Sequence, residues 1–270
     1  MKLNIVPARH GVLWVKQGLR AFIKQPLALI GLFFMFMAVM SMASLLPYVG
    51  NVLALMLLPA ATLGLMAATK ESSQGKFPMP LVLVSAFRAG SQRLRAMLAL
   101  GAMYAAGFLG VMAVSALFDG GQFAQLYLVG GKITEEMMNS GDFLTAMWVA
   151  MALYMPLSMV FWHAPGLVHW HGVSPVKSLF FSGVACVRNM GAYTVYSLAW
   201  MGIFMLAGIV LTTIAALSGN PAMLSALLLP VAMLIIAMFF TSIYFTFADS
   251  FLAPDPPTVP SSSLPETPNP

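Results

Sequence analysis

Charged residues are scarce in this chain: Asp, Glu, Lys and Arg make up 8% of its 270 residues. A soluble domain usually carries about 25% charged residues, so this chain cannot cover a surface that faces water. Apolar residues make up 60% of the chain. They fall into runs of about 20 residues, the length that a helix needs to cross a bilayer, whereas a transmembrane β-barrel would show alternating segments of about 10. The sequence therefore predicts an all-α, polytopic transmembrane helical bundle.

Cysteine and catalytic motifs are also nearly absent. The single cysteine, Cys186, excludes an intramolecular disulfide and gives no zinc or iron–sulfur pattern. The chain has no Walker A motif, no Gly-x-Ser-x-Gly elbow and no His-Glu-x-x-His. We therefore expect no cofactor and a non-enzymatic protein.

The apolar runs predict six spans arranged as three hairpins. Pro47–Asn51 and Ser218–Pro221 are turn sequences that close the first and third hairpins. None of the spans contains Asp, Glu, Lys or Arg, which argues against ion-coupled transport. The predicted spans are 26–46, 51–69, 96–117, 144–163, 191–216 and 222–247.

Each hairpin is preceded by a stretch that we interpret as a basic amphipathic surface helix. The first is 8–25, the second 80–95, and the third follows Ser174-Pro175, a good helix start. Gly18, Gly90 and Gly183 occupy comparable places in the three stretches, which suggests a threefold repeat. Together these elements form one transmembrane domain, residues 1–252. Residues 253–270, rich in Pro, Ser and Thr, are expected to be a disordered cytoplasmic tail.

Basic residues are divided very unequally between the two sides of the predicted bundle. Twelve of the 13 Lys and Arg residues lie on the side of the termini, and only Lys132 lies opposite. The positive-inside rule then places both termini in the cytoplasm. Because these charges flank apolar spans, the net charge of +5 favours anionic lipid headgroups over nucleic acid as partners. The residues predicted to contact headgroups or a partner are Lys16, Arg20, Lys24, Arg88, Arg93, Arg95, Lys177 and Arg188.

Three histidines cluster between the fourth and fifth spans. His163, His169 and His171 could supply imidazole ligands to a metal. However, His169 and His171 are two residues apart and would point to different faces of a helix. The neighbouring Trp162 and Trp170 indicate an interfacial aromatic belt. Interfacial packing is therefore the main interpretation, and a metal site is a minority hypothesis.

The same region carries a family resemblance. Its residues are Ala164-Pro165, Leu167-Val168, Ser174-Pro175, Ser178, Ser182, Ala185-Cys186 and Arg188-Asn189, with Val6-Pro7-Ala8, Trp14, Gly18, Phe22 and Pro26 near the start. They resemble an uncharacterised family of proteobacterial six-helix inner-membrane proteins, over about residues 5–250. The chain is also distantly similar to the membrane domains of some glycerophosphodiester phosphodiesterases. The resemblance implies a multi-pass bacterial inner-membrane protein of unknown function, with no assigned site residues.

Three functions are compatible with these features. The first is a non-enzymatic protein that organises lipid or partner proteins through its basic helices. The second is a small transporter or channel for a small solute or lipid. Its expected mark is a continuous polar cavity lined by Thr62, Tyr104, Tyr154, Thr212, Thr213 or Tyr244. The third, an enzyme acting on lipids, would depend on the histidine cluster.

Overall fold

The computed structural model describes residues 2–47, 49–220 and 222–252. The turn positions Tyr48 and Pro221 and the predicted tail lie outside the described residues. Within the described part, the only strands are Lys2–Leu3 (β1) and Phe251–Leu252 (β2). They pair in antiparallel fashion and join the two ends of the described chain. Everything else is helix, turn or loop, so the all-α prediction is confirmed.

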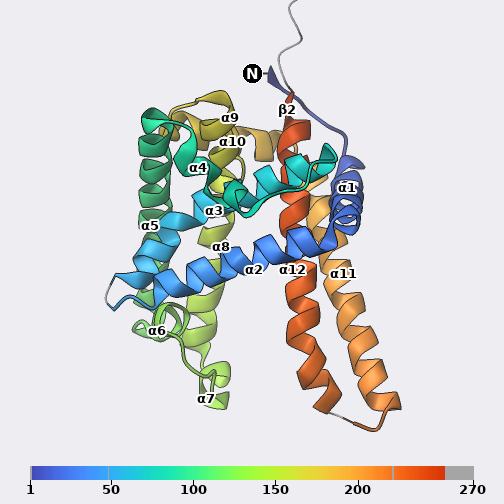
Figure 1. Ribbon diagram of the computed structural model, residues 1–270. Helices are drawn as coiled ribbons and strands as arrows, with labels where there is room; N and C mark the ends of the chain where they lie inside the picture. The colour runs from blue at the N-terminus through green and yellow to red at the C-terminus, as the bar shows by residue number, and fades with distance from the viewer. Residues whose placement is uncertain (1, 48, 221, 253–270) are drawn as a thin grey trace, which may run out of the picture.

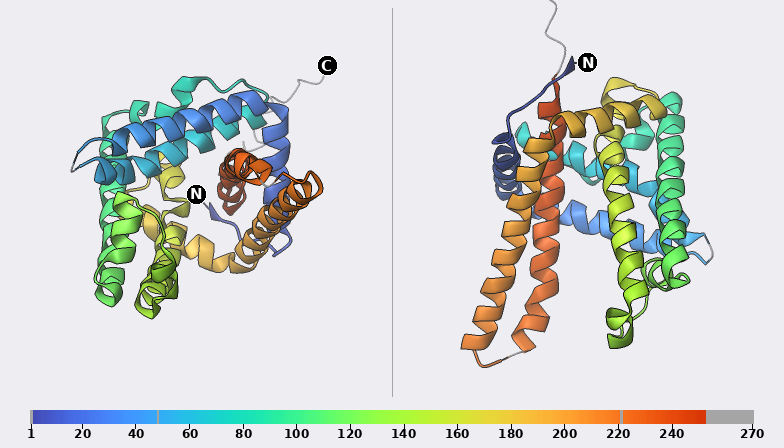
Figure 2. Two further views of the ribbon diagram at one scale, coloured as in Figure 1. Left: turned by 90° about the horizontal axis from the view of Figure 1, so that it is seen from below. Right: turned by 180° about the vertical axis from the view of Figure 1, so that it is seen from behind.

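The structure contains six helices that are long and apolar enough to cross a membrane, among the residues it describes. They pack as the three predicted hairpins, α2–α3, α5–α8 and α11–α12. Figures 1 and 2 show that the axes of α2 and α3 run at a large angle to those of the other four helices. Composition alone did not reveal this difference in direction. The six helices are α2 (Pro26–Ser44), α3 (Gly50–Ser73), α5 (Ser91–Asp119), α8 (Gly141–Trp162), α11 (Met190–Leu217) and α12 (Ala222–Ser250).

Two of the three predicted surface helices are present. The first is α1 (His10–Lys24), and the third is α10 (Pro175–Arg188), which follows the short helix α9 (Ala164–His171). The prediction of one amphipathic helix over 80–95 is wrong. That stretch forms a 3₁₀ helix η1 (Pro80–Val84) and a single turn α4 (Ser85–Arg88). Gly90, with φ +96°, then breaks the chain direction before α5 begins.

The three glycines that suggested a repeat lie in different environments. A Cβ on Gly18 would meet the backbone of Ser242 at 2.7 Å, so α1 needs a glycine to approach α12. Gly90 has open space around it, and Gly183 faces only the side chain of Val160. The three positions therefore do not share a structural role, and the glycine spacing gives no support to a threefold repeat.

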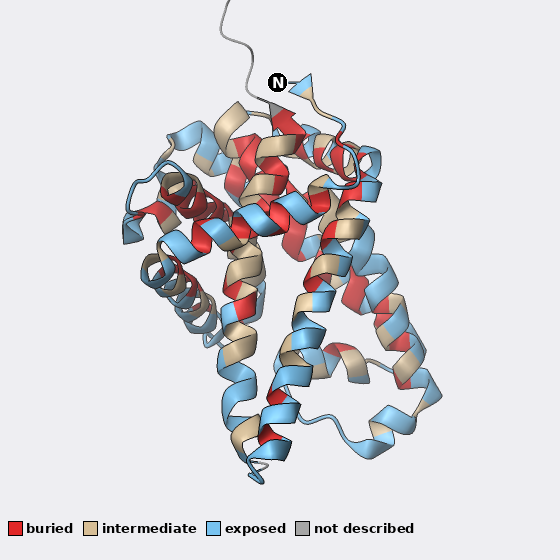
Figure 3. Cartoon of the chain, turned by 90° about the vertical axis from the view of Figure 1, so that its right-hand side faces the viewer, coloured by how far each residue is buried: buried red, intermediate tan, exposed pale blue. Residues whose placement is uncertain are grey.

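Buried residues concentrate at one end of the bundle, as Figure 3 shows. We call this the basic end; it carries the N-terminus, α1, α4, α9, α10 and the first turns of α5. The other halves of α11 and α12 expose apolar side chains such as Met205, Leu206 and Leu229, each at least 60% exposed. A large apolar surface of this kind is stable in lipid and not in water.

The opposite end carries the long polar loop. That loop contains two short helices, α6 (Gln122–Val129) and α7 (Glu135–Asn139). The Asp119 carboxylate accepts hydrogen bonds from the backbone N–H groups of Gly121 and Phe123, at 2.8 and 2.6 Å. Asp119 thus caps the start of α6, a local role that its sequence position did not indicate.

Candidate functional site

Helix α10 presents its polar face to the protein and its apolar face outward. Val176, Phe180 and Val187 are 68%, 65% and 60% exposed, whereas Ser178 and Ser182 are fully buried. This orientation is the reverse of a helix on a water-soluble protein. Such a face is stabilised by contact with lipid and not by contact with water.

The buried face of α10 closes a polar cluster around His163. Tyr193 Oη lies 2.9 Å from His163 Nε2, and Cys186 Sγ lies 4.0 Å from Nδ1. Ser182 Oγ accepts from the His163 backbone N–H and donates to the Met159 carbonyl. The cluster therefore fastens α10 to the bend between α8 and α9, where the hydrogen bonding of α8 stops.

The environment of Cys186 makes it a poor nucleophile. Burial raises the pKa of its thiol to about 12, so the thiol stays protonated at neutral pH. No acidic side chain is hydrogen-bonded to His163 within the described residues. A His–Cys pair of this kind lacks the geometry of a nucleophile activated by a base.

The structure separates the three histidines of the minority metal hypothesis. His163 is fully buried, the His171 ring packs on Phe247 with centroids 6.0 Å apart, and His169 lines a pocket beside α4. Among the described residues, no three His, Cys, Asp or Glu side chains gather in a way that could hold a metal ion. The histidine spacing therefore does not translate into a metal centre.

A second polar cluster joins the two ends of the chain and was missed at the sequence level. The Asp249 carboxylate lies 2.6 Å from His10 Nδ1 and accepts from Trp14 Nε1 at 2.9 Å. Asn189 accepts from the Val6 backbone N–H and donates to the Asn4 carbonyl. Asp249, on α12, is the acceptor that holds α1 against α12. Its partners are more than 230 residues away in sequence, so no local pattern could indicate them.

All eight basic residues predicted to contact headgroups are exposed and lie toward the basic end. Lys16, Arg20 and Lys24 follow the outer side of α1, whose opposite side packs on α11 and α12. Arg93 and Arg95, expected on a surface helix, instead lie near the start of α5. Among the described residues the one ion pair is His10–Asp249, so none of the eight is neutralised by a carboxylate within 4.0 Å.

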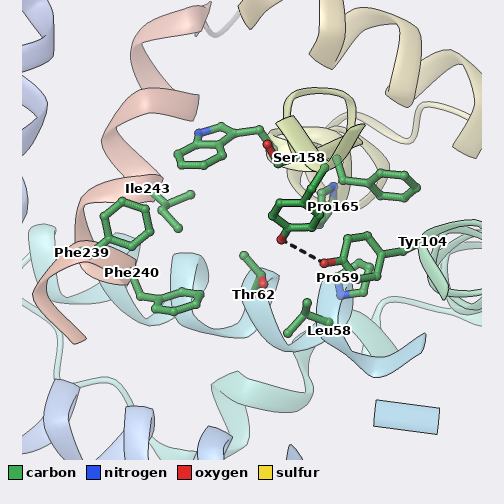
Figure 4. Close-up of a pocket in the computed structure, with 12 residues that line it drawn as sticks. Leu58, Pro59, Thr62, Tyr104, Ser158, Pro165, Phe239, Phe240 and Ile243 are labelled. Atoms are coloured by element: carbon green, nitrogen blue, oxygen red, sulfur yellow. Dashed lines mark hydrogen bonds between the residues drawn. The ribbon is translucent and has the colours of Figure 1, made fainter. Parts of the chain in front are cut away.

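A cavity lies between α3, α5, α8, α9 and α12, as Figure 4 shows. Its volume is about 180 Å³. Thr62, Tyr104 and Tyr154 line it, and the two tyrosine hydroxyls are 3.3 Å apart. The remaining lining is mostly aromatic or aliphatic, for example Leu58, Phe240 and Ile243.

The other three residues expected on a polar pathway lie elsewhere. Thr212 and Thr213 donate to carbonyls of their own helix and are exposed, while the Tyr244 ring packs on Trp170. The six residues therefore do not form the continuous polar cavity expected of a solute channel.

Six apolar helices in three hairpins, with lipid-facing outer surfaces and one basic end, define a polytopic α-helical integral membrane protein. The chain belongs to the same family as a protein of Burkholderia thailandensis named probable inner membrane protein. The two are 37% identical over 268 residues, which span 97% of this chain and 99% of that relative. No family model matches the chain, and no solved structure matches it. This relative and the six helices identify a multi-pass inner-membrane protein.

Proposed function

We propose that this protein is non-enzymatic and that its basic end binds anionic phospholipid at the cytoplasmic face, where it organises lipid or partner proteins. The observation that carries the proposal is the set of eight exposed Lys and Arg side chains at one end, none with a carboxylate partner among the described residues. The outward apolar face of α10 supports it, because that face sets this end at headgroup depth.

The cytoplasmic orientation of both termini is part of the proposal. The distribution of Lys and Arg favours it through the positive-inside rule. The β1–β2 pair supports it as well, because it brings both ends of the described chain to the basic end (Figure 1). The distant similarity to glycerophosphodiester phosphodiesterase membrane domains stays a prediction.

The experiment changes Lys16, Arg20 and Lys24 together to Gln. Each basic residue near an anionic surface contributes about 1 kcal/mol, so the triple variant is expected to lower affinity for phosphatidylglycerol about 100-fold. The measurement is the amount of anionic lipid that co-purifies, read by mass spectrometry. A matched control exchanges Lys for Arg and Arg for Lys at the same three positions, which keeps the charge. Unchanged lipid retention in the Gln variant would refute the proposal.

A second candidate is transport of a lipid, and the cavity of Figure 4 favours it over transport of a polar solute. The cavity is lined mainly by apolar side chains and lies between α8 and α12, which make few direct contacts with each other. Thr62→Trp would fill it. A transporter would lose lipid movement in reconstituted vesicles, whereas a lipid-organising protein would keep its anionic lipid content.

A further inference from the structure

A polar pocket opens at the basic end, apart from the cavity of Figure 4. It lies between the end of α3, the segment η1–α4, the start of α5, and α9. Its volume is about 590 Å³, within the usual range of about 300–1,000 Å³ for ligand sites. Close packing holds its wall in place, since a Cβ on Gly64 of α3 would meet the backbone of Leu83 in η1 at 2.7 Å. The pocket is lined by Glu71, Met79, Leu81, Val82, Ser85, Arg88, Ala89, Arg93 and His169.

Positive charge dominates this pocket. Arg88 and Arg93 both line it, and neither forms an ion pair within 4.0 Å among the described residues. Lys70 precedes the lining residue Glu71, and its Nζ lies 5.1 Å from the centroid of the Trp170 ring, which follows His169 in the chain. Helix α5 begins at Ser91, between the lining residues Ala89 and Arg93, and the start of a long helix favours an anion. Glu71 is the one acidic residue in the lining.

Two buried polar atoms in the lining have no partner. Ser85 Oγ and His169 Nδ1 are both inaccessible to solvent, and neither makes a hydrogen bond within the described structure. Buried polar groups are normally paired, because an unpaired one costs stability. A hydroxyl and an imidazole N–H can both donate to the oxygen of an anion. Two polar groups without protein partners, beside two arginines without a carboxylate partner among the described residues, favour an anion in this pocket.

We propose that this pocket binds the phosphate group of an anionic phospholipid headgroup. Arg88 and Arg93 supply charge-assisted, planar hydrogen bonds to phosphate oxygens. Ser85 and His169 line the same pocket, and a change of side-chain rotamer would bring their covered polar atoms to the phosphate. The pocket lies at the basic end, which the proposed function sets at headgroup depth, so a headgroup can enter while its chains stay in the membrane. This inference rests on the proposed function and names one specific site within it. Free phosphate has the same chemistry, and the experiment distinguishes the two sources.

The experiment compares Arg93→Gln with Arg9→Gln. Both side chains are exposed and both changes remove one positive charge, but only Arg93 lines the pocket, and Arg9 is not one of the eight residues of the proposed function. Purified protein in detergent is titrated with phosphatidylglycerol, and binding is followed by native mass spectrometry. We expect Arg93→Gln to weaken the tightest binding event about tenfold and Arg9→Gln to change it less than twofold. Glu71→Gln is expected to leave it unchanged or tighten it.

Parallel titrations with inorganic phosphate and with phosphatidylcholine identify the source. If phosphatidylglycerol raises the thermal stability of the protein and phosphate alone does not, the result supports a lipid headgroup as the ligand. If phosphate raises the thermal stability and the lipid does not, the headgroup assignment is overturned. Equal effects of Arg93→Gln and Arg9→Gln would overturn the pocket itself. In that case, the proposed function would still hold if the variant with Lys16, Arg20 and Lys24 changed to Gln retains less anionic lipid, as expected.

The Ser85→Ala variant tests whether Ser85 contributes to lipid binding or only to the stability of the fold. In the proposed site the hydroxyl is unpaired until ligand binds, so this variant is expected to fold with unchanged or slightly higher thermal stability without lipid. It should also bind phosphatidylglycerol more weakly than the unchanged protein. Lower stability without lipid, together with unchanged binding, would show that Ser85 is structural and would refute its role here.

Discussion

Asp249 holds the N-terminal helix against the last span, and replacing it with Ala tests how much that contact contributes. The carboxylate accepts from the Trp14 indole N–H at 2.9 Å and lies 2.6 Å from His10 Nδ1. Trp14 is 0% exposed, so without Asp249 its N–H is buried and unpaired. His10 and Asp249 keep 25% and 33% of their side-chain surface exposed, so water can replace that second contact.

The expected loss follows from these two environments. A hydrogen bond to a charged acceptor contributes about 1.5–3 kcal/mol, which applies to the buried Trp14 donor. The partly exposed contact between His10 and Asp249 contributes about 0–1 kcal/mol, as for exposed pairs. Asp249→Ala is therefore expected to lower the free energy of unfolding by about 1.5–4 kcal/mol. Asp249→Asn keeps one acceptor oxygen and should lose less.

A double-mutant cycle isolates the Trp14–Asp249 bond from the packing of the indole. Trp14→Phe also loses ring contacts, including one with Tyr193 at 5.2 Å between centroids, but the cycle cancels that loss. Unfolding is measured by circular dichroism in dodecyl maltoside with rising SDS. We expect a coupling energy of about 1–2 kcal/mol. Additive effects within about 0.5 kcal/mol, or a larger cost for His10→Ala than for Trp14→Phe, would refute this account of the contact.

Two further predictions follow from packing and burial. Cys186 is the only cysteine, and its pKa is raised to about 12; since only the thiolate reacts, maleimide labelling at pH 7 should be about 1,000-fold slower than for an ordinary thiol. Labelling in SDS should be complete, and fast labelling of the native protein would contradict the burial. Gly18→Leu should destabilise the protein by about 1–3 kcal/mol, because the new side chain meets the Ser242 backbone. Gly31→Leu, with nothing within 4 Å, is the matched control and should be nearly neutral.

The sequence alone predicted the class, the number of spans and the hairpin pairing. These features depend on the length of apolar runs and on turn residues, which are local properties of the chain. The helix that begins at Ser174-Pro175 is present for the same reason, with Ser174 at its N-cap position and Pro175 first in the helix. The basic residues are exposed as expected, because a charged group without a partner is costly to bury.

Tertiary structure alone decided which polar groups meet. The sequence grouped His163, His169 and His171 by proximity along the chain, yet the fold separates them and pairs His163 with Tyr193. It also brings Asp249 to Trp14, and Ser85 to the same pocket as His169. Such contacts depend on how α1, α3, α9 and α12 pack, and close approaches at small residues contribute to that packing. Gly18 lets α1 approach α12, and Gly64 lets α3 approach η1. Local composition does not encode these approaches, so the pocket beside Arg88 and Arg93 was identified only in the folded protein.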